Sequence, residues 1–378
     1  MKKPIIDVTD LYHPHQDVGD NFDLVAAYAL PEIDLRAVIL DCTEPFRHPR
    51  CEFGGFVDTA GPRDPGFIPV TQLNYIFNRN VPAAVSPFHP MKSPDDKLLD
   101  APGFQQTGIE LILQTLREAR EPVSILVFCS CRAVAAAFNR EPKLFRDKVE
   151  RLHLCIGTCS PDIFSVDYGV DYTLNKRIPL IPGTKGYMEW NVELDPHAFV
   201  RLLRSELPIA LYPDAAEGGG FALDRHNTFY RLPNLEFIRN MHPQLRSYLA
   251  YAFNRTCRND FLCAMDEPPA AEFLNKLGER QHNVWETAVW LGISGRKLVK
   301  HANGQYRIVP PTEVRTDDTV LPNEMRPCTI KATDDGRFDF KFTDKPTNFA
   351  IYDRVDPQEN QIALREALPA LYQSFLGA

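Results

Sequence analysis

The chain has 378 residues, of which 44% are hydrophobic and 24% are charged, and its formal net charge is −8. This is the composition of an ordinary globular protein, long enough to bury a core without disulfide or metal staples. The acidic balance argues against nucleic acid as a partner, because binding a phosphate backbone needs a basic face. No apolar run reaches the about 20 residues of a membrane helix, so we expect no membrane partner.

The nine cysteines are an odd number, and the first residues resemble a strand more than a secretory leader. We therefore expect reduced thiols and a cytoplasmic protein. The cysteine spacings also lack the close pairs or neighbouring histidines that a zinc site needs.

The N-terminal segment predicts a β-α-β unit. A short apolar strand at 4–6 ends at Asp7, a polar loop follows, a buried helix covers 22–30, and a second strand covers 35–40. A unit of this kind implies a parallel sheet with helices on its faces.

The same alternation continues downstream. We expect helices at 108–120, from 133 and at 196–207, and strands at 123–128, 149–156 and 208–212. Asp195 is a suitable cap for the helix that begins with Pro196. The pattern predicts a Rossmann-like α/β fold with a mainly parallel central sheet and helices on both faces.

After residue 213 the pattern loosens. Residues 214–232 predict a flexible loop, and 233–295 are expected to be largely helical. Strand-like pieces between 300 and 350 include a hairpin turn at Asp335-Gly336, and a closing helix covers 361–376. We therefore expect one α/β domain over 1–299, with a β-rich extension over 300–378 that carries a β-hairpin and packs on the same domain.

An acidic loop follows the first strand. Its aspartates, which fall within 17 positions, are Asp7, Asp10, Asp17, Asp20 and Asp23. Ligands of open α/β sheets bind at the edge where the strands end. Clustered carboxylates repel one another unless a cation or hydrogen bonds offset the charge, and their oxygens favour calcium or magnesium. A solvated loop with helix-capping aspartates is the alternative.

Several segments resemble the nucleoside hydrolases, of the inosine-uridine preferring type, and mark the chain as a divergent relative. They are the opening IIDVTD, DVGDNFDLVAAYAL and PEIDLRAVIL, the strand and altered turn PVSILVFCSCRAVAAAF, the stretch MEWNVELDPHAFVRLL and the late WETAV. The most specific match is the family's Glu-x-Asn-x-x-x-Asp-Pro pattern, present here as Glu189, Asn191, Asp195 and Pro196. The similarity covers roughly residues 1–295.

The acidic loop departs from the family pattern, because it is longer and has no two adjacent aspartates. One alignment keeps Asp7 and Asp10 on the strand and replaces the family's aspartate pair with Asp20 and Asp23. Another makes Asp17 the start of the family's Asp-x-Gly, again with Asp23 in the pair. Both alignments remain open.

The resemblance implies calcium-dependent hydrolysis of the N-glycosidic bond of a ribonucleoside or similar riboside, through an oxocarbenium-like sugar. The base that activates the water would be Asp10 or Asp17. The implied calcium ligands are Asp7, Asp10, Asp17, Asp23, the backbone carbonyl of Phe128, and Glu286.

The resemblance also implies a substrate-binding set. Glu189 and Asn191 would hold the ribose hydroxyls, and the rest of the set is Asp20, Glu44, His13, His15 and Trp285. Glu44 stands near the family's asparagine after the second strand, and Trp285 takes the place of a histidine. His13, His15, His226 and His282 are candidates for a general acid. The residues that could stack on a base are Tyr12, Phe229 and Trp285.

Three other functions were weighed. One is a hydrolase of a different glycosylated compound on the same scaffold, and another is a catalytically silent calcium- and sugar-binding protein. A Rossmann dehydrogenase is rejected, because acidic residues occupy the place of Gly-x-Gly-x-x-Gly after the first strand. The expected partner is a small nucleoside or riboside, and a homo-oligomer is left open.

Overall fold

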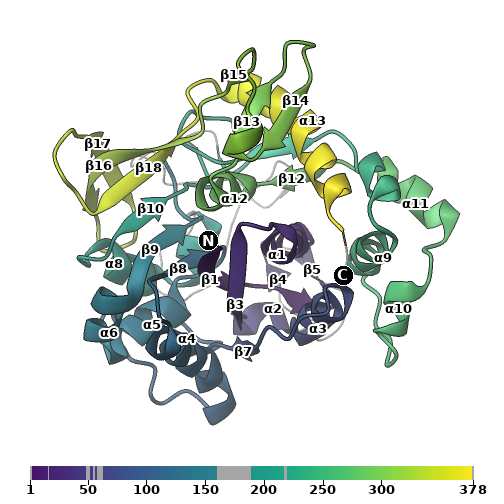
Figure 1. The fold of residues 1–378 in the computed structure, drawn as a ribbon. Helices are drawn as coiled ribbons and strands as arrows, with labels where there is room; N and C mark the ends of the chain where they lie inside the picture. The colour runs from purple at the N-terminus through teal and green to yellow at the C-terminus, as the bar shows by residue number, and fades with distance from the viewer. Residues whose placement is uncertain are drawn as a thin grey trace.

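The computed structural model describes residues 2–15, 17–47, 52–53, 56–57, 63–159, 189–216 and 219–376. A nine-stranded sheet runs through the centre in the order β17-β16-β18-β10-β9-β8-β1-β3-β7 (Figure 1). Its strands are β1 (Lys3–Thr9), β3 (Ile33–Leu40), β7 (Ala83–Val85), β8 (Val123–Val127), β9 (Val149–Leu154), β10 (Ile209–Leu211), β16 (Glu324–Ala332), β17 (Phe338–Phe342) and β18 (Phe349–Asp353). Every neighbouring pair from β7 to β18 is parallel, whereas β16 and β17 are antiparallel additions. The expected α/β fold with a mainly parallel sheet is confirmed.

Helices cover both faces of this sheet (Figure 1). One face carries α4 (Thr107–Glu118), α5 (Arg132–Arg140), α6 (Pro142–Lys148) and α8 (Pro196–Leu203). The other carries α1 (Gly19–Ala29), α3 (Phe67–Ile76), α9 (Pro243–Phe253), α12 (Thr287–Ser294) and α13 (Pro357–Ser374). The shorter helices are α2 (Glu44–Arg47), α7 (Trp190–Leu194), α10 (Cys263–Asp266) and α11 (Ala271–Gly278).

Strand β1 shows why the sheet is buried on both sides. Ile5 belongs to the core on the α1 face and Ile6 to the core on the α4 face, and both are fully buried. Successive side chains of a strand point to opposite faces, so Asp7 lies on the same face as Ile5. A carboxylate is thereby placed inside an apolar core.

The C-terminal segment extends the main sheet. The predicted hairpin is present as β16 and β17, and Gly336 in its turn has the positive φ of 90° that favours glycine. Strand β18 then returns beside β10 in parallel. A separate three-stranded sheet is formed by β13 (Lys297–Lys300), β14 (Tyr306–Val309) and β15 (Thr319–Val320). The closing helix α13 begins at Pro357, earlier than expected, because the Asp356 side chain caps it.

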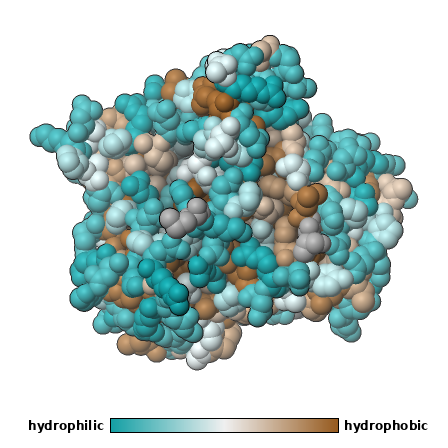
Figure 2. All heavy atoms as spheres, viewed as in Figure 1, coloured by the Kyte–Doolittle hydropathy of each residue, from teal (hydrophilic) through white to brown (hydrophobic). Residues whose placement is uncertain are grey.

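Short strand pairs join the loops at the sheet's edge. They are β2 (Tyr12–His13) with β6 (Asp64–Pro65), β4 (Glu52–Phe53) with β5 (Phe56–Val57), and β11 (Tyr230–Leu232) with β12 (His282–Val284). The surface in Figure 2 is mainly hydrophilic, with hydrophobic side chains in scattered areas. No helix in the described part of the chain is long and apolar enough to cross a membrane.

Candidate active site

Two buried aspartates mark the centre of the acidic cluster. Asp7 is fully buried, and neither of its carboxylate oxygens has a hydrogen-bond partner in the described chain. Burial, with a smaller contribution from Asp20, raises the pKa of Asp7 well above its usual range. Asp23 on α1 accepts a hydrogen bond from Trp290 Nε1 at 3.0 Å, while its second oxygen has no partner. Burial and then Glu286 raise the pKa of Asp23 strongly.

Asp20 and Glu286 bring two distant segments to this centre. The Thr9 hydroxyl donates to Asp20 at 2.7 Å, which joins the end of β1 to the start of α1. Burial and the charge of Asp17 raise the pKa of Asp20 to about 7. Glu286 immediately precedes α12 and accepts the Trp285 backbone N–H at 2.9 Å. Burial, and then the charges of Asp20 and Asp17, raise the pKa of Glu286 to about 8.

The remaining two aspartates of the loop differ in their exposure. Asp17 is exposed, and its carboxylate accepts the Gly19 backbone N–H at 2.9 Å, at the start of α1. Asp10 follows β1 and is partly exposed. Burial and then the charges of Asp20 and Asp41 raise the pKa of Asp10 well above its usual range. All five aspartates of the sequence prediction therefore lie in one interacting cluster with Glu286.

Glu189 and Asn191 lie at the ends of the neighbouring strands. The Glu189 carboxylate accepts backbone N–H groups from Gly157 and Asn191 at 2.8 Å each and from Val192 at 3.1 Å. Asn191 donates its side-chain amide to Asp214 at 3.1 Å. Both residues are buried, so Glu189 is held firmly at the start of α7 while Asn191 faces the end of β10.

Asn191 also reaches two strand-end carbonyls. Its amide donates to the backbone oxygens of Cys155 at 3.2 Å and Phe128 at 3.5 Å. The Phe128 carbonyl that the resemblance assigned to calcium therefore already receives this hydrogen bond. The Phe128 ring stacks on Trp290, whose indole N–H donates to Asp23. These contacts connect the part of the site around Asn191 with the acidic cluster.

Two carboxylates of the site were not among the predicted residues. Asp41 follows β3 directly and accepts the hydroxyls of Ser86 at 2.5 Å and Ser130 at 2.6 Å. Asp214 follows β10 and accepts the Asn191 amide and the Cys155 thiol at 2.9 Å. Burial and then Glu189 raise the pKa of Asp214 strongly. Each comes shortly after an apolar strand, and that repeated pattern was the available signal.

Glu44 lies further along than Asp41. It begins α2, and its carboxylate is 3.5 Å from Arg47. Its backbone N–H donates to the Phe88 carbonyl at 3.1 Å. Asp41, in contrast, directly follows the second predicted strand. Its negative charge contributes to the raised pKa of Asp10.

The candidate histidines fall into separate places. His13 and His15 pack together, with His13 against Tyr251 of α9. Burial lowers the pKa of His15 to about 3, so its imidazole is neutral near pH 7. His226 contacts the Tyr352 carbonyl near the hairpin. Burial lowers the pKa of His282, and the negative charge of Asp17 partly offsets this.

An aromatic cluster adjoins Glu286. It consists of Phe221, Phe229 and Trp285, whose ring centroids lie 5.4 to 5.8 Å apart. The Trp285 indole N–H donates to the Gly220 carbonyl at 2.9 Å. Phe229 is buried, whereas Phe221 and Trp285 keep part of their surface exposed. Two of the three predicted stacking residues, Phe229 and Trp285, are therefore together beside the carboxylates. The third, Tyr12, is buried and bonded to Thr43.

The donors fit calcium in chemistry, although they are not gathered around one point. Within the described ranges, no three His, Cys, Asp or Glu side chains are positioned to share a metal ion. The unpartnered oxygens of Asp7 and Asp23 are nevertheless buried hard ligands that lack compensation. Binding a cation would require side-chain rotation within the cluster.

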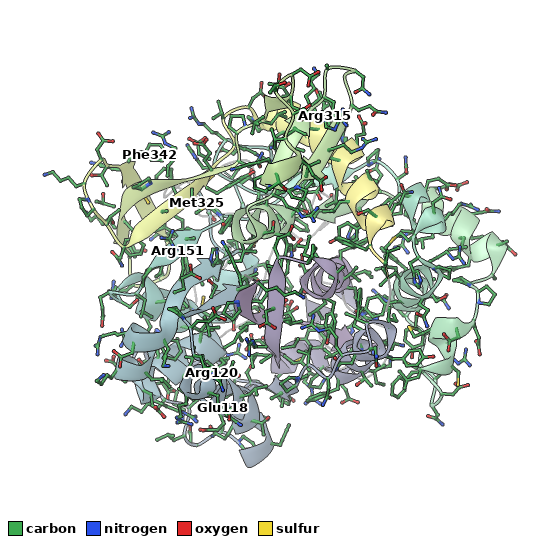
Figure 3. The ribbon with its side chains drawn as sticks, in the orientation of Figure 1. Glu118, Arg120, Arg151, Arg315, Met325 and Phe342 are labelled. Carbon is green, nitrogen blue, oxygen red and sulfur yellow. The ribbon has the colours of Figure 1, made fainter. Side chains whose placement is uncertain are left out.

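A groove of about 670 Å³ lies on the opposite side of the sheet, where the parallel strands begin. It is bordered by the starts of β1 and β8, at Pro4 and Val123, and by the end of α4. Figure 3 labels Glu118 and Arg120 there. It is therefore separate from the carboxylates, which gather where the strands end.

No protein-family model and no curated protein matches the sequence. Among solved structures, an inosine-guanosine nucleoside hydrolase has a TM-score of 0.52 at 12% identity, over 97% of this chain and 98% of that one. A plant nucleoside hydrolase has a TM-score of 0.50 at 12% identity, over 97% and 99%. A purine-preferring ribonucleoside hydrolase from Gardnerella vaginalis has a TM-score of 0.50 at 14% identity, over 98% and 99%. The protein has the nucleoside hydrolase fold.

The likeness to nucleoside hydrolases extends beyond the part recognised in the sequence. The motifs ended near residue 295, whereas the structural match covers nearly the whole chain. The C-terminal strands and helix α13 are therefore part of the same fold.

Proposed function

We propose that the protein hydrolyses the N-glycosidic bond of a ribonucleoside or similar riboside. The observation that carries the proposal is the cluster of buried carboxylates at the strand ends of a nucleoside hydrolase fold. Such a cluster is costly to maintain, and strongly perturbed carboxylates in one place are typical of functional sites.

Cleavage of an N-glycosidic bond develops positive charge on the sugar. The carboxyl groups of Asp20, Asp23 and Glu286, at positions fixed by α1 and α12, would offset this charge in their ionised forms. A bound cation would favour ionisation, because it lowers the pKa values that burial and mutual repulsion raise. Asp10 is the better placed of the two candidate bases. Asp17 is exposed and engaged by Gly19, whereas Asp10 stands directly at the end of β1.

Calcium is part of the proposal, with ligands drawn from Asp7, Asp10, Asp17, Asp23, Glu286 and the Phe128 carbonyl. When bound, it would supply positive charge against the carboxylate repulsion and acidify a water. The chain's own residues hold the ligand oxygens: Trp290 fixes Asp23, and the Trp285 N–H fixes Glu286.

The ribose end of the proposed site is formed by Asn191 with Asp214, next to Glu189. Asn191 already donates to Asp214, so the carboxylate is oriented to accept a sugar hydroxyl on its remaining lone pairs. Both oxygens of Glu189 receive backbone N–H groups, so its carboxylate also holds the start of α7, and with it Asn191, in place.

The test is ribose release from inosine and uridine. Asn191→Ala and Asp23→Asn should each lower kcat by at least about a hundredfold, because their contacts strengthen as charge develops. Asp34→Asn, which removes a partly exposed carboxylate at the other end of β3, is the matched control and should stay near the wild type. Normal rates in both site variants would refute the assigned residues.

A hydrolase of a different glycoside is the second candidate. Trp285 in place of a titratable side chain, and the buried His13 and His15 in the longer loop, favour a leaving group other than the usual base. A panel of ribosides separates the two candidates. Binding of sugar and calcium without release of any aglycone would instead identify a silent binding protein.

A further inference from the structure

Arg354 is a fully buried cation that binds the loop beside the candidate site. It follows β18 and is 1% exposed. Its guanidinium donates to the backbone oxygen of Asp224 at 2.8 Å, to that of Phe229 at 2.8 Å, and to the side chain of Asn227 at 2.7 Å. Residues 214–232 were expected to be a flexible loop, but within 219–229 a single side chain fixes three positions.

The residues next to Arg354 in the chain also bind this loop. Asp353 receives two hydrogen bonds from Arg225, at 2.7 and 2.8 Å. His226 lies 3.1 Å from the Tyr352 carbonyl, and the Arg354 backbone N–H donates to the Arg225 carbonyl. The end of β18 and the loop are therefore joined at consecutive residues. Figure 3 labels Met325 and Phe342 on the neighbouring β16 and β17, which support β18 from the outer side.

Two sets of contacts connect this loop with the candidate site. Asn227, held by Arg354, donates to the Asp214 carbonyl at 3.3 Å. Phe229, whose carbonyl Arg354 binds, packs its ring on Phe221 and Trp285. Trp285 directly precedes Glu286 of the carboxylate cluster.

We infer that Arg354 is a positioning residue, which holds the Phe221–Phe229–Trp285 cluster in place for a planar leaving group. The inference rests on the proposed function for the identity of that group. Aromatic faces bind planar bases by stacking, and Trp285, which keeps part of its surface exposed, directly precedes Glu286. The C-terminal segment thereby contributes to substrate selection without touching the substrate.

The test separates base affinity from sugar affinity. Arg354→Met should raise KM for inosine and the dissociation constant for free hypoxanthine by at least about tenfold, with inhibition by free ribose changed less than about twofold. Arg354→Lys keeps the charge but not the planar fork, and should fall between Met and the wild type. Arg307→Met is the control, because Arg307 belongs to the same segment but pairs with Glu366.

Amide hydrogen exchange supplies a readout that does not need catalysis. In Arg354→Met, exchange over 219–229 should quicken by at least about tenfold, while β1 and β8 remain unchanged. If the fully buried site does not tolerate substitution, Arg225→Met provides the same test from the surface, since Arg225 is 45% exposed. Its effects should have the same pattern and a smaller size.

The outcomes are distinct. Unchanged exchange over 219–229, or faster exchange with unchanged hypoxanthine affinity, would overturn the inference. Equal losses of ribose and hypoxanthine affinity would also overturn it, because they indicate a general collapse of the site. If the wild type cleaves no riboside of the panel, the proposed function fails, whereas exchange and hypoxanthine binding still decide the role of Arg354.

Discussion

A single residue, Arg132, joins the strand ends beneath the candidate site. It is fully buried at the start of α5, 3.2 Å from Asp195 and 3.8 Å from Asp41, and it donates to the Pro87 carbonyl at 2.7 Å. The arginine therefore compensates two buried carboxylates from different elements. Asp195 uses its other oxygen to cap α8, as its position before Pro196 predicted.

Removing this cation should be strongly destabilising. Arg132→Met leaves Asp41 and Asp195 buried without a counter-charge, so we expect a loss of about 3–5 kcal/mol in the free energy of unfolding. Urea denaturation measures it. Arg36→Met, which breaks an exposed pair with Asp34, is the control and should change stability by less than about 1 kcal/mol. Equal urea midpoints for the two variants would contradict this account.

At the scale of elements, the sequence predicted the helices and strands that have a recognisable local sequence pattern. The β1-α1-β3 unit, α4, α8 and the β16–β17 hairpin follow from apolar periodicity, caps and turn residues. The elements that the sequence did not predict include α3, α6, β7, β11, β12 and β18. Strand β7 is only three residues long, and β18 finds its parallel place beside β10 through contacts far apart in the chain. No local signal specifies such a pairing.

The link between β18 and the loop should depend on pH. Burial alone would raise the pKa of Asp353, but the hydrogen bonds from Arg225 and Arg326 outweigh it and hold the pKa below its usual range. A depressed carboxyl pKa stabilises the fold above the unfolded value of about 4, and this contribution is lost as pH falls towards the folded pKa. Asp353→Asn should therefore lower the urea midpoint at pH 7 and somewhat less at pH about 3, where the contribution is only partly lost. A difference that is the same at both pH values would refute the assignment.

At the scale of the whole molecule, parallel strands explain why the candidate site draws on residues from Asp7 to Glu286. The parallel strands all end on the same side of the sheet; in sheet order they are β7, β3, β1, β8, β9, β10 and β18. The residues that follow β1, β3 and β10 therefore meet there. The acidic loop, Glu189 and Asn191 could be selected from the sequence because motifs surround them. Asp41 and Asp214 had only the general signal of an acidic residue after an apolar strand. Arg354 acts through partners remote in the chain, and a single sequence does not reveal such pairs.

The same convergence creates a stability problem that calcium would relieve. Asp7 and Asp23 carry buried oxygens without partners, and the charges of the cluster raise one another's pKa values. A ligand bound only by the folded state stabilises it, by about 2.7 kcal/mol at a hundredfold excess over its dissociation constant. Calcium should thus raise the melting temperature of metal-free protein in differential scanning calorimetry, and magnesium less, because it demands stricter octahedral geometry.

Variants distinguish a specific site from general screening of charge. Asp7→Asn and Asp23→Asn should raise the melting temperature of metal-free protein, since each removes a buried carboxyl group whose ionisation is opposed by burial, and should abolish the calcium-dependent increase. Asp34→Asn leaves the cluster intact and should keep the full increase. If wild-type protein melts at the same temperature in calcium and in chelator, the calcium proposal is wrong, and the carboxylates must be compensated by protonation alone.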